Sequence, residues 1–138
     1  MADIAVTAAN VVKGANAKTK HGIAGATITA GQLVYEDPAD SRKLKPAKAD
    51  AAATDAVEGI ALHAALSGQP LEIDYDDDAF VCGGTIAVGT AYVLSAAVAG
   101  SFAPEADLAI TNLCTLIGFA KSTTVMMLAI KVTSAAHA

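Results

Sequence analysis

The sequence contains no tryptophan, and its 138 residues include only three phenylalanines and three tyrosines. Alanine supplies the largest share of the residues counted as hydrophobic, which make up 54% of the chain. Small side chains bury little area each, and hydrophobic stabilisation scales with the area buried. A chain of this composition needs very regular packing or a partner surface, which suggests a component of an assembly.

Basic residues are also few, with nine lysines and arginines against fourteen acidic residues and a net charge of −5. Binding to phosphate groups needs a basic stripe. Here the basic residues are scattered, so we expect no direct nucleic-acid partner. The one basic cluster, "RKLKPAK" at 42–48, lies between acidic segments and is predicted to be a solvated loop of mixed charge.

The two cysteines, Cys82 and Cys114, show neither a CxxC motif nor a histidine at metal-ligand spacing. We therefore expect reduced, buried thiols. The first residues carry Asp3 where a signal peptide has basic residues, so secretion by that route is not expected. Residues 79–104 carry no charge, but four glycines interrupt them, and two buried strands explain this stretch better than a membrane helix.

No segment shows a sustained helical stripe of apolar residues with capping signals at both ends. Alternating and β-branched segments, among them 57–62 and 71–75, predict a mainly β fold. Residues 1–25 contain glycines amid polar residues and are predicted to be an extended N-terminal arm. Residues 26–138 then form a single β domain, a compact β-barrel or β-sandwich.

The segment "ITAGQLVYED" at Ile28 is echoed by "IAVGTAYVLS" at Ile86, which predicts two similar halves, about 26–78 and 84–133. Neither half could bury both faces of its few short strands alone. The four glycines predicted at matched turns or bulges are Gly31, Gly59, Gly89 and Gly118. The residue pairs expected to match are Val34 and Tyr92, Pro46 and Pro104, Ile60 and Phe119, Leu71 and Leu128, and Ile73 and Ile130.

The run "DYDDD" is the strongest charge feature of the sequence. In an extended strand Asp74, Asp76 and Asp78 share one face, and clustered carboxylates can bind calcium. Ala79 and Thr85 occupy the positions where an EF-hand loop has glycine and glutamate. We therefore favour a charged strand end that prevents edge-to-edge aggregation.

No catalytic constellation is present in the sequence. None of the histidines, at positions 21, 63 and 137, has a cysteine, histidine or carboxylate at metal-ligand spacing, and no GxSxG motif occurs. The sequence thus predicts no catalytic residues, no cofactor, no metal ligand and no enzymatic activity. Of the pair Met126 and Met127, one must face away from the core unless the last strand is buried on both faces.

Four segments, "ITAGQLVYED", "AVEGIAL" followed by "SGQPLEI", "TIAVGTAYVLSAAVAG" and "LIGFAKS", together resemble the small head decoration, or cement, proteins of tailed bacteriophages. The resemblance covers about residues 22–133. It implies a β-barrel or β-sandwich subunit, often trimeric, that docks on the outer face of a capsid and bridges neighbouring capsomers. The implied partners are the major capsid protein and further copies of the chain, as a homotrimer or a dimer. The implied location is the virion surface, after synthesis in the host cytoplasm.

The N-terminal arm is β-capable and low in charge, so it could add a strand to the sheet edge of a partner. The predicted partner contacts are Ala2, Asp3, Ile4, Ala5, Val6, Thr7, Val11 and Val12. The second half, uncharged from 86 to 104, is predicted to hold a buried interface. One alternative is a carbohydrate- or receptor-binding module of a phage fibre or bacterial surface protein, which would need exposed aromatic rings. Another is a biotinyl- or lipoyl-like domain, which would need a lysine in the linker 74–85.

Overall fold

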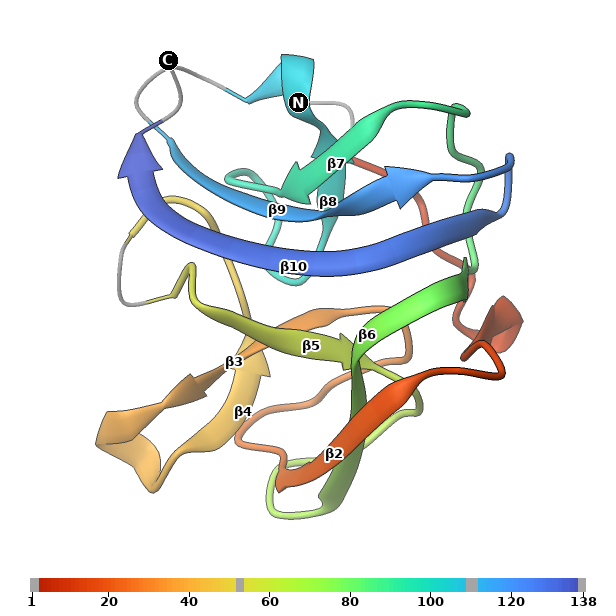
Figure 1. The fold of residues 1–138 in the computed structure, drawn as a ribbon. Coiled ribbons are helices and arrows are strands. Elements are labelled where there is room, and N and C mark those ends of the chain that lie inside the picture. Colours follow the sequence, from red (N-terminus) through yellow and green to blue (C-terminus); the bar gives the residue numbers. More distant parts are fainter. Residues whose placement is uncertain (1–2, 52–53, 109–111, 137–138) are drawn as a thin grey trace.

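The computed structural model describes residues 3–51, 54–108 and 112–136, and it is mainly β, with 49% of residues in strands. Its antiparallel sheet curls into a half-barrel (Figure 1), which confirms the predicted fold class. Three short 3-10 turns, η1 (Ala8–Asn10), η2 (Pro38–Asp40) and η3 (Glu105–Asp107), are the helical elements of the described residues. The strands are β1 (Val11–Val12), β2 (Lys18–Ile23), β3 (Leu33–Asp37), β4 (Lys43–Pro46), β5 (Val57–Ala61), β6 (Pro70–Cys82), β7 (Ala91–Leu94), β8 (Phe102–Pro104), β9 (Leu113–Ala120) and β10 (Val125–Ala136).

Strand β6 joins two halves of the sheet, whose order is β4-β3-β5-β6-β10-β9-β7-β8. Asp74, in the first half of β6, pairs with Ile60 of β5 on one edge and Thr19 of β2 on the other. Val81, near its end, pairs instead with β10 and β1. Along its 13 residues, β6 therefore passes from one half to the other, and Figure 1 shows the two halves stacked on either side of the passage.

The strand registers of the two halves match. In the first half, pairing between β3 and β5 is irregular after Val34, which lies opposite Gly59. In the second half, pairing between β7 and β9 is irregular after Tyr92, which lies opposite Gly118. The outer strands also agree, because Val34 lies opposite Pro46 and Tyr92 lies opposite Pro104. The same bulge therefore recurs at the same place in both halves.

The turns that lead into β3 and β7 match as well. Gly31 and Gly89 both have positive φ, at 89° and 79°, where a side chain would be strained. The N–H of Gly31 donates to the Ala61 carbonyl at 2.8 Å, and that of Gly89 donates to the Ala120 carbonyl at 3.0 Å. The first turn is thereby fixed to the end of β5 and the second to the end of β9.

The predicted match of the closing strands is wrong. Ile73 lies opposite Ala61, and Met126 lies opposite Ala120, so Ile73 corresponds to Met126 and not to Ile130. The "L-x-I" similarity misled because apolar alternation looks alike at every even offset along a strand. Hydrogen-bond register, which the sequence does not display, decides the equivalence.

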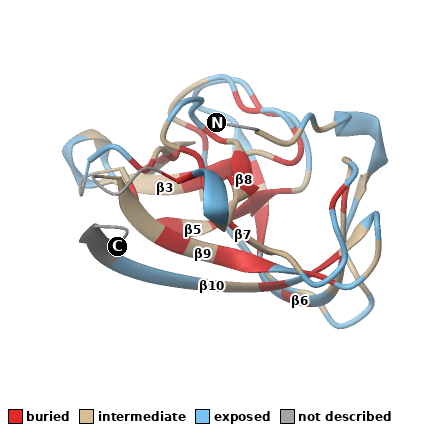
Figure 2. Ribbon diagram, turned by 90° about the horizontal axis from the view of Figure 1, so that it is seen from above, coloured by how far each residue is buried: buried red, intermediate tan, exposed pale blue. Residues whose placement is uncertain are grey.

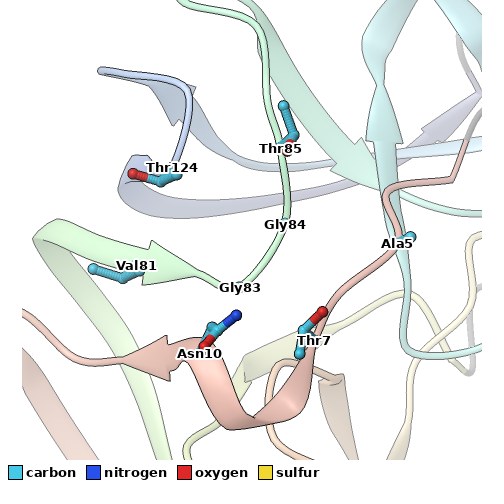
Figure 3. A pocket seen from close by; sticks show the side chains of 8 residues that line it. All are labelled: Ala5, Thr7, Asn10, Val81, Gly83, Gly84, Thr85 and Thr124. Atoms are coloured by element: carbon cyan, nitrogen blue, oxygen red, sulfur yellow. The ribbon is translucent and has the colours of Figure 1, made fainter.

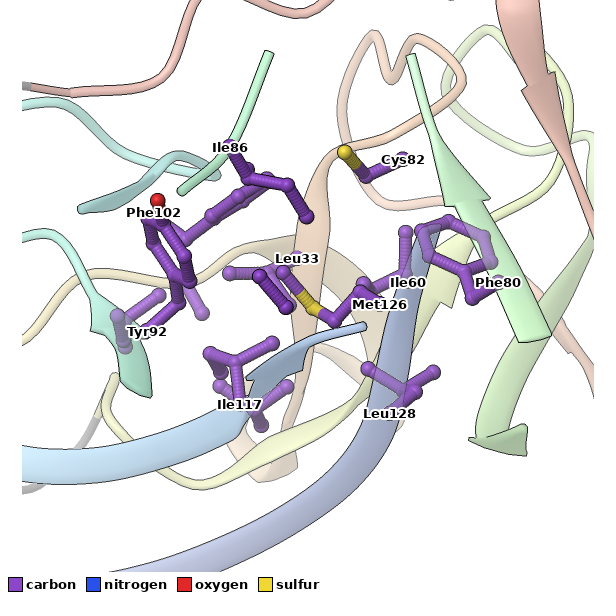
Figure 4. Packing of buried hydrophobic residues seen from close by; sticks show 14 of the residues in the cluster. Leu33, Ile60, Phe80, Cys82, Ile86, Tyr92, Phe102, Ile117, Met126 and Leu128 are labelled. Carbon is purple, nitrogen blue, oxygen red and sulfur yellow. The ribbon is translucent and has the colours of Figure 1, made fainter. Parts of the chain in front are cut away.

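Two clusters of apolar side chains form the core. The smaller cluster fills the first half and includes Ile28, Val34, Leu44 and Ile73. The larger cluster fills the second half, and Figure 4 shows Leu33 and Ile60 of the first half among its members. The two halves therefore pack as one body, because the second half covers the outer face of β3 and β5. The other members of this cluster labelled in Figure 4 are Phe80, Cys82, Ile86, Tyr92, Phe102, Ile117, Met126 and Leu128.

Residues 3–25 differ from the predicted extended arm. Residues 18–23 form β2, which pairs with β6 along six positions and so belongs to the sheet. The preceding residues lie along the second half, where the Ile4 N–H donates to the Phe102 carbonyl and the Thr7 N–H donates to the Gly83 carbonyl. Ile4, Val6 and Val11 also pack against the larger core cluster. The segment is extended but docked, because its backbone bonds to Phe102 and Gly83 and its apolar side chains pack on the core.

The uncharged stretch 79–104 forms the end of β6, then β7 and β8. This agrees with the expectation of buried strands. Among the described residues, no helix has the length and apolar character needed to cross a membrane.

Because Gly59 and Gly118 occupy equivalent positions in the two halves, we expect substitution of either one to destabilise the protein. A Cβ on Gly118 would overlap the Met127 carbonyl oxygen, and one on Gly59 would lie 2.8 Å from the Asp74 carbonyl oxygen. We expect Gly59→Ala and Gly118→Ala each to lower the free energy of unfolding by ~1–3 kcal/mol, because backbone atoms cannot move aside. Urea unfolding measures this. Gly22→Ala is the control, since its nearest neighbours are side-chain atoms of Leu44, and a cost equal to that of the other two would contradict the argument.

Candidate functional site

The described residues contain no group of three or more His, Cys, Asp or Glu side chains placed to hold a metal ion. His21 is exposed and lies 3.9 Å from Glu72. His63 fixes the connection between β5 and β6: its Nε2 accepts the Glu72 N–H at 3.0 Å, and its Nδ1 lies 3.0 Å from the Ala64 carbonyl. His137 lies outside the described residues.

The acidic run does not place Asp74, Asp76 and Asp78 on one face, which corrects the sequence interpretation. Asp74 and Asp77 are buried, with exposed fractions of 0% and 1%, whereas Asp76 and Asp78 are exposed. Pairing irregularities on both edges of β6 rotate the strand between these residues. The alternation of side chains between the two faces of the strand is interrupted here, because a bulge inserts one extra residue. The three-carboxylate cation site, the less favoured interpretation of this run, therefore does not form. The favoured interpretation of a charged strand end is also wrong, because the run lies within β6 and is paired on both edges.

Asp74 and Asp77 form a buried acid pair at the point where β6 passes from β5 to β10. Asp77 accepts the Gly14 N–H at 2.7 Å and the Ala79 N–H at 3.0 Å. Neither oxygen of Asp74 has a well-formed bond to an N–H or O–H donor among the described residues. The hydrogen bond between the two carboxyl groups therefore requires a proton on one of them.

The environment assigns this proton to Asp74. Burial, and then the hydrogen bond and charge of Asp77, raise the pKa of Asp74 to about 8. Burial also acts to raise the pKa of Asp77, but hydrogen bonds from Asp74, Gly14 and Ala79 outweigh it and lower that pKa below 3.8. One carboxyl group is thus neutral and the other charged at neutral pH, as expected for two carboxyls in one site.

The outer face of β7, β9 and β10 carries a row of apolar side chains. Ala91 lies opposite Phe119, and Phe119 lies opposite Met127, so the three side chains share one face. Phe119 and Met127 are 45% and 42% exposed. We call these three residues the apolar row. Figure 2 shows that many residues of β10 are exposed or intermediate.

The corresponding row of the first half is fully covered. Leu33 lies opposite Ile60, and Ile60 lies opposite Asp74, which is the same register as in the apolar row. All three residues are 0% exposed. The second half covers this row, whereas nothing in the described chain covers the equivalent row of the second half. The apolar row is therefore the one of the two equivalent rows that has no second β unit packed on it in the described chain.

Sequence reasoning located this surface only in part. The alternation at the two methionines is as expected, since Met126 is 0% exposed and Met127 faces outward. The match of Phe119 with Ile60 indicated its place in the repeat but not its exposure, because exposure depends on what lies across the sheet. Its position in register with Met127 was the available signal, and it becomes visible only once strand pairing is known.

A cleft of about 440 Å³ lies between the N-terminal segment and the connection that follows β6 (Figure 3). Its lining is small and uncharged: Ala5, Thr7, Asn10, Val81, Gly83, Gly84, Thr85 and Thr124. A Cβ on Gly84 would lie 2.7 Å from the Ala5 carbonyl oxygen, so this glycine lets the two backbones approach. Ala5 and Thr7 point into the cleft, whereas Ile4 and Val6 pack on the core.

Both cysteines are free. Cys82 is buried, and burial raises the pKa of its thiol. Cys114 is half-buried, which differs from the expectation that both thiols are buried, and burial followed by the charge of Glu105 raises its thiol pKa. Raised thiol pKa values oppose nucleophilic reactivity, because the thiolate is the reactive form.

The fold and its surfaces define a mainly β half-barrel of two matched units with one uncovered apolar row. Compared with models of known protein families and with curated proteins, the chain gives no match.

The acid pair predicts how stability changes with pH. Because the pKa of Asp74 is raised from 3.8 to about 8, its contribution is fully present below pH 3.8 and is lost as pH rises to about 8. Asp77 acts in the opposite sense, and its contribution is lost as pH falls below 3.8. We expect Asp74→Asn to remove the loss on the alkaline side and to raise stability at pH 8 by at least about 1.4 kcal/mol, the value of one pKa unit.

Urea unfolding from pH 4 to 9 measures this effect. The control is Asp78→Asn, which changes an exposed carboxylate of the same strand and is expected to leave the profile as in the unchanged protein. A profile for Asp74→Asn that still falls toward pH 8 would show that Asp74 is not the group responsible.

Proposed function

We propose that the protein is a virion structural protein that decorates the outer surface of a phage capsid and stabilises it by bridging neighbouring capsomers. The resemblance noted in the sequence motivates this proposal, and the mainly β fold of two matched units is compatible with it. The proposed partner is the major capsid protein. Copies of the chain are proposed to associate on the capsid as a trimer.

The observation that carries the proposal is the uncovered apolar row. Inside the chain, the equivalent row of the first half is buried by a second β unit, so this face is suited to sheet-on-sheet packing. A bridging protein needs such a face but no reactive group. Its contacts with a repeated lattice are individually weak, and their sum gives firm attachment. Binding only to the assembled shell then shifts the equilibrium away from disassembly.

The N-terminal segment has a more restricted part in this proposal than its sequence suggested. Ile4, Val6 and Val11 are engaged with the core of their own chain. Ala5, Thr7 and Val12 are exposed and remain available to a partner. Ala2 lies outside the described residues, and Asp3 is half-buried. We therefore assign partner contact to the exposed positions of the segment alone.

Co-sedimentation with undecorated shells tests the apolar row. We expect Phe119→Lys and Met127→Lys each to weaken binding about tenfold or more, equivalent to ~1.4 kcal/mol, because a lysine in a dry interface leaves a charge unpaired. Val98→Lys is the matched control, since Val98 is 51% exposed on the connection between β7 and β8. Equal binding by all three folded variants would exclude the row, and no sedimentation of the unchanged protein would exclude the proposed function.

The N-terminal segment is tested by separating its two faces. Thr7→Arg is expected to weaken shell binding about tenfold without changing the free energy of unfolding, because the side chain is exposed. Val6→Ala is expected to do the reverse and to cost ~1 kcal/mol of stability, because its side chain packs on the core. Sedimentation and urea unfolding measure the two effects, and unaltered binding by Thr7→Arg would remove the segment from the interface.

A further inference from the structure

The loop between β1 and β2, residues 13–17, closes over the buried acid pair. Its Gly14 N–H donates to Asp77 Oδ2 at 2.7 Å, and a Cβ on Gly14 would overlap Asp77 Oδ1. Asn16 adds a longer bond of 3.4 Å to Asp78. The loop thus rests directly on the carboxyl group that shares a proton with Asp74.

In the part of the chain that the structure describes, no cation fully balances the pair. On β6 itself, Asp76 and Asp78 are further negative charges, and Lys18 of β2 is directed to Asp76 at 3.5 Å. Lys13 of the loop lies 3.9 Å from Glu72. Lys121, in the connection between β9 and β10, donates to the Asp78 carbonyl and acts on Asp77 only through its charge. The residues of β5 and β10 opposite the pair, Ile60 and Leu128, are apolar.

When Asp74 loses its proton, the pair carries a second negative charge, which needs water to solvate it. Water can enter only if one of the surrounding elements opens, and these elements differ in how easily they do so. Strands β5, β6 and β10 belong to the core, and Ile60 and Leu128 are 0% exposed. The loop over the pair is largely exposed and lies between two edge strands. Local opening follows the region with the fewest buried contacts, which here is the loop.

We propose that a proton shared by Asp74 and Asp77 fastens the N-terminal segment, residues 3–17, to β6, and that loss of this proton releases the loop and loosens the segment. With the proton present, the two carboxyls bond to each other and Asp77 holds the Gly14 N–H. Without it, the two charges repel, and opening of the loop lets water solvate them. The segment is then free of its anchor at Gly14.

The same segment carries the exposed residues assigned to partner contact. A proton-dependent anchor would therefore set how readily this segment leaves its own chain. The inference concerns the free protein and does not rest on the proposed partner. Because the pKa of Asp74 is raised from 3.8 to about 8, the anchor weakens as the pH rises above 3.8 and its proton-dependent part is lost at about pH 8.

Limited trypsin digestion of the full chain tests the anchor, because Lys13 lies in the loop and Arg42 lies in an exposed turn of the first half. The ratio of cleavage after Lys13 to cleavage after Arg42 cancels the pH dependence of trypsin. We expect this ratio to rise by up to about tenfold per pH unit as the pH rises toward about 8, the pKa of Asp74, and to level off above it, as linkage requires for one proton. In Asp74→Asn, whose amide keeps the bond to Asp77, we expect a ratio that stays flat.

Three outcomes would overturn the proposal. A ratio that does not change with pH in the unchanged protein shows that proton loss does not open the loop. An equal rise in Asp74→Asn shows that another group is responsible. A rise that calcium ions abolish at alkaline pH, with no effect of a chelator at neutral pH, shows that the pair binds a cation in place of the proton. Amide hydrogen exchange at residues 11–17, corrected for intrinsic rates, gives the same comparison without a protease.

Discussion

The rest of the structure depends on the continuous pairing of β6 along both edges. Its first part is held between β2 and β5 and its second part between β1 and β10, so one strand belongs to both halves. A strand that changes partners must bend, and the bulges around Asp74 and Asp77 provide the bend. The same bulges turn two carboxyl groups inward, which makes the junction sensitive to protonation.

Sharing β6 also makes the two halves unequal. Because the second half lies on the outer face of the first, Leu33 and Ile60 are buried in the larger core cluster, which fills the second half. The equivalent residues Ala91 and Phe119 have no such cover within the described chain. The second half covers this face of the first half, but there is no third unit in the described chain to cover the equivalent face of the second half. This physical asymmetry is the observation on which the proposed binding function rests.

The fold could be predicted from the sequence to a considerable extent. Alternation and β-branched residues indicated strands at 57–62 and 71–75, where the structure has β5 and part of β6, and the echo between Ile28 and Ile86 indicated two matched units. The candidate surfaces could not be predicted in the same way. Phe119 and Ile60 match in sequence and register, yet one is 45% exposed and the other 0%, because burial depends on what lies across the sheet.

The sequence by itself determined the period of the strands, the positions of the turns and the scarcity of charge in the second half, because these follow from local backbone preferences and side-chain chemistry. Only the tertiary structure decided which acidic residues are buried, where the N-terminal segment lies and which apolar row is open. Each of these depends on register and on contacts between residues far apart in the chain. The bulges in β6 were enough to place Asp77 instead of Asp76 on the buried face.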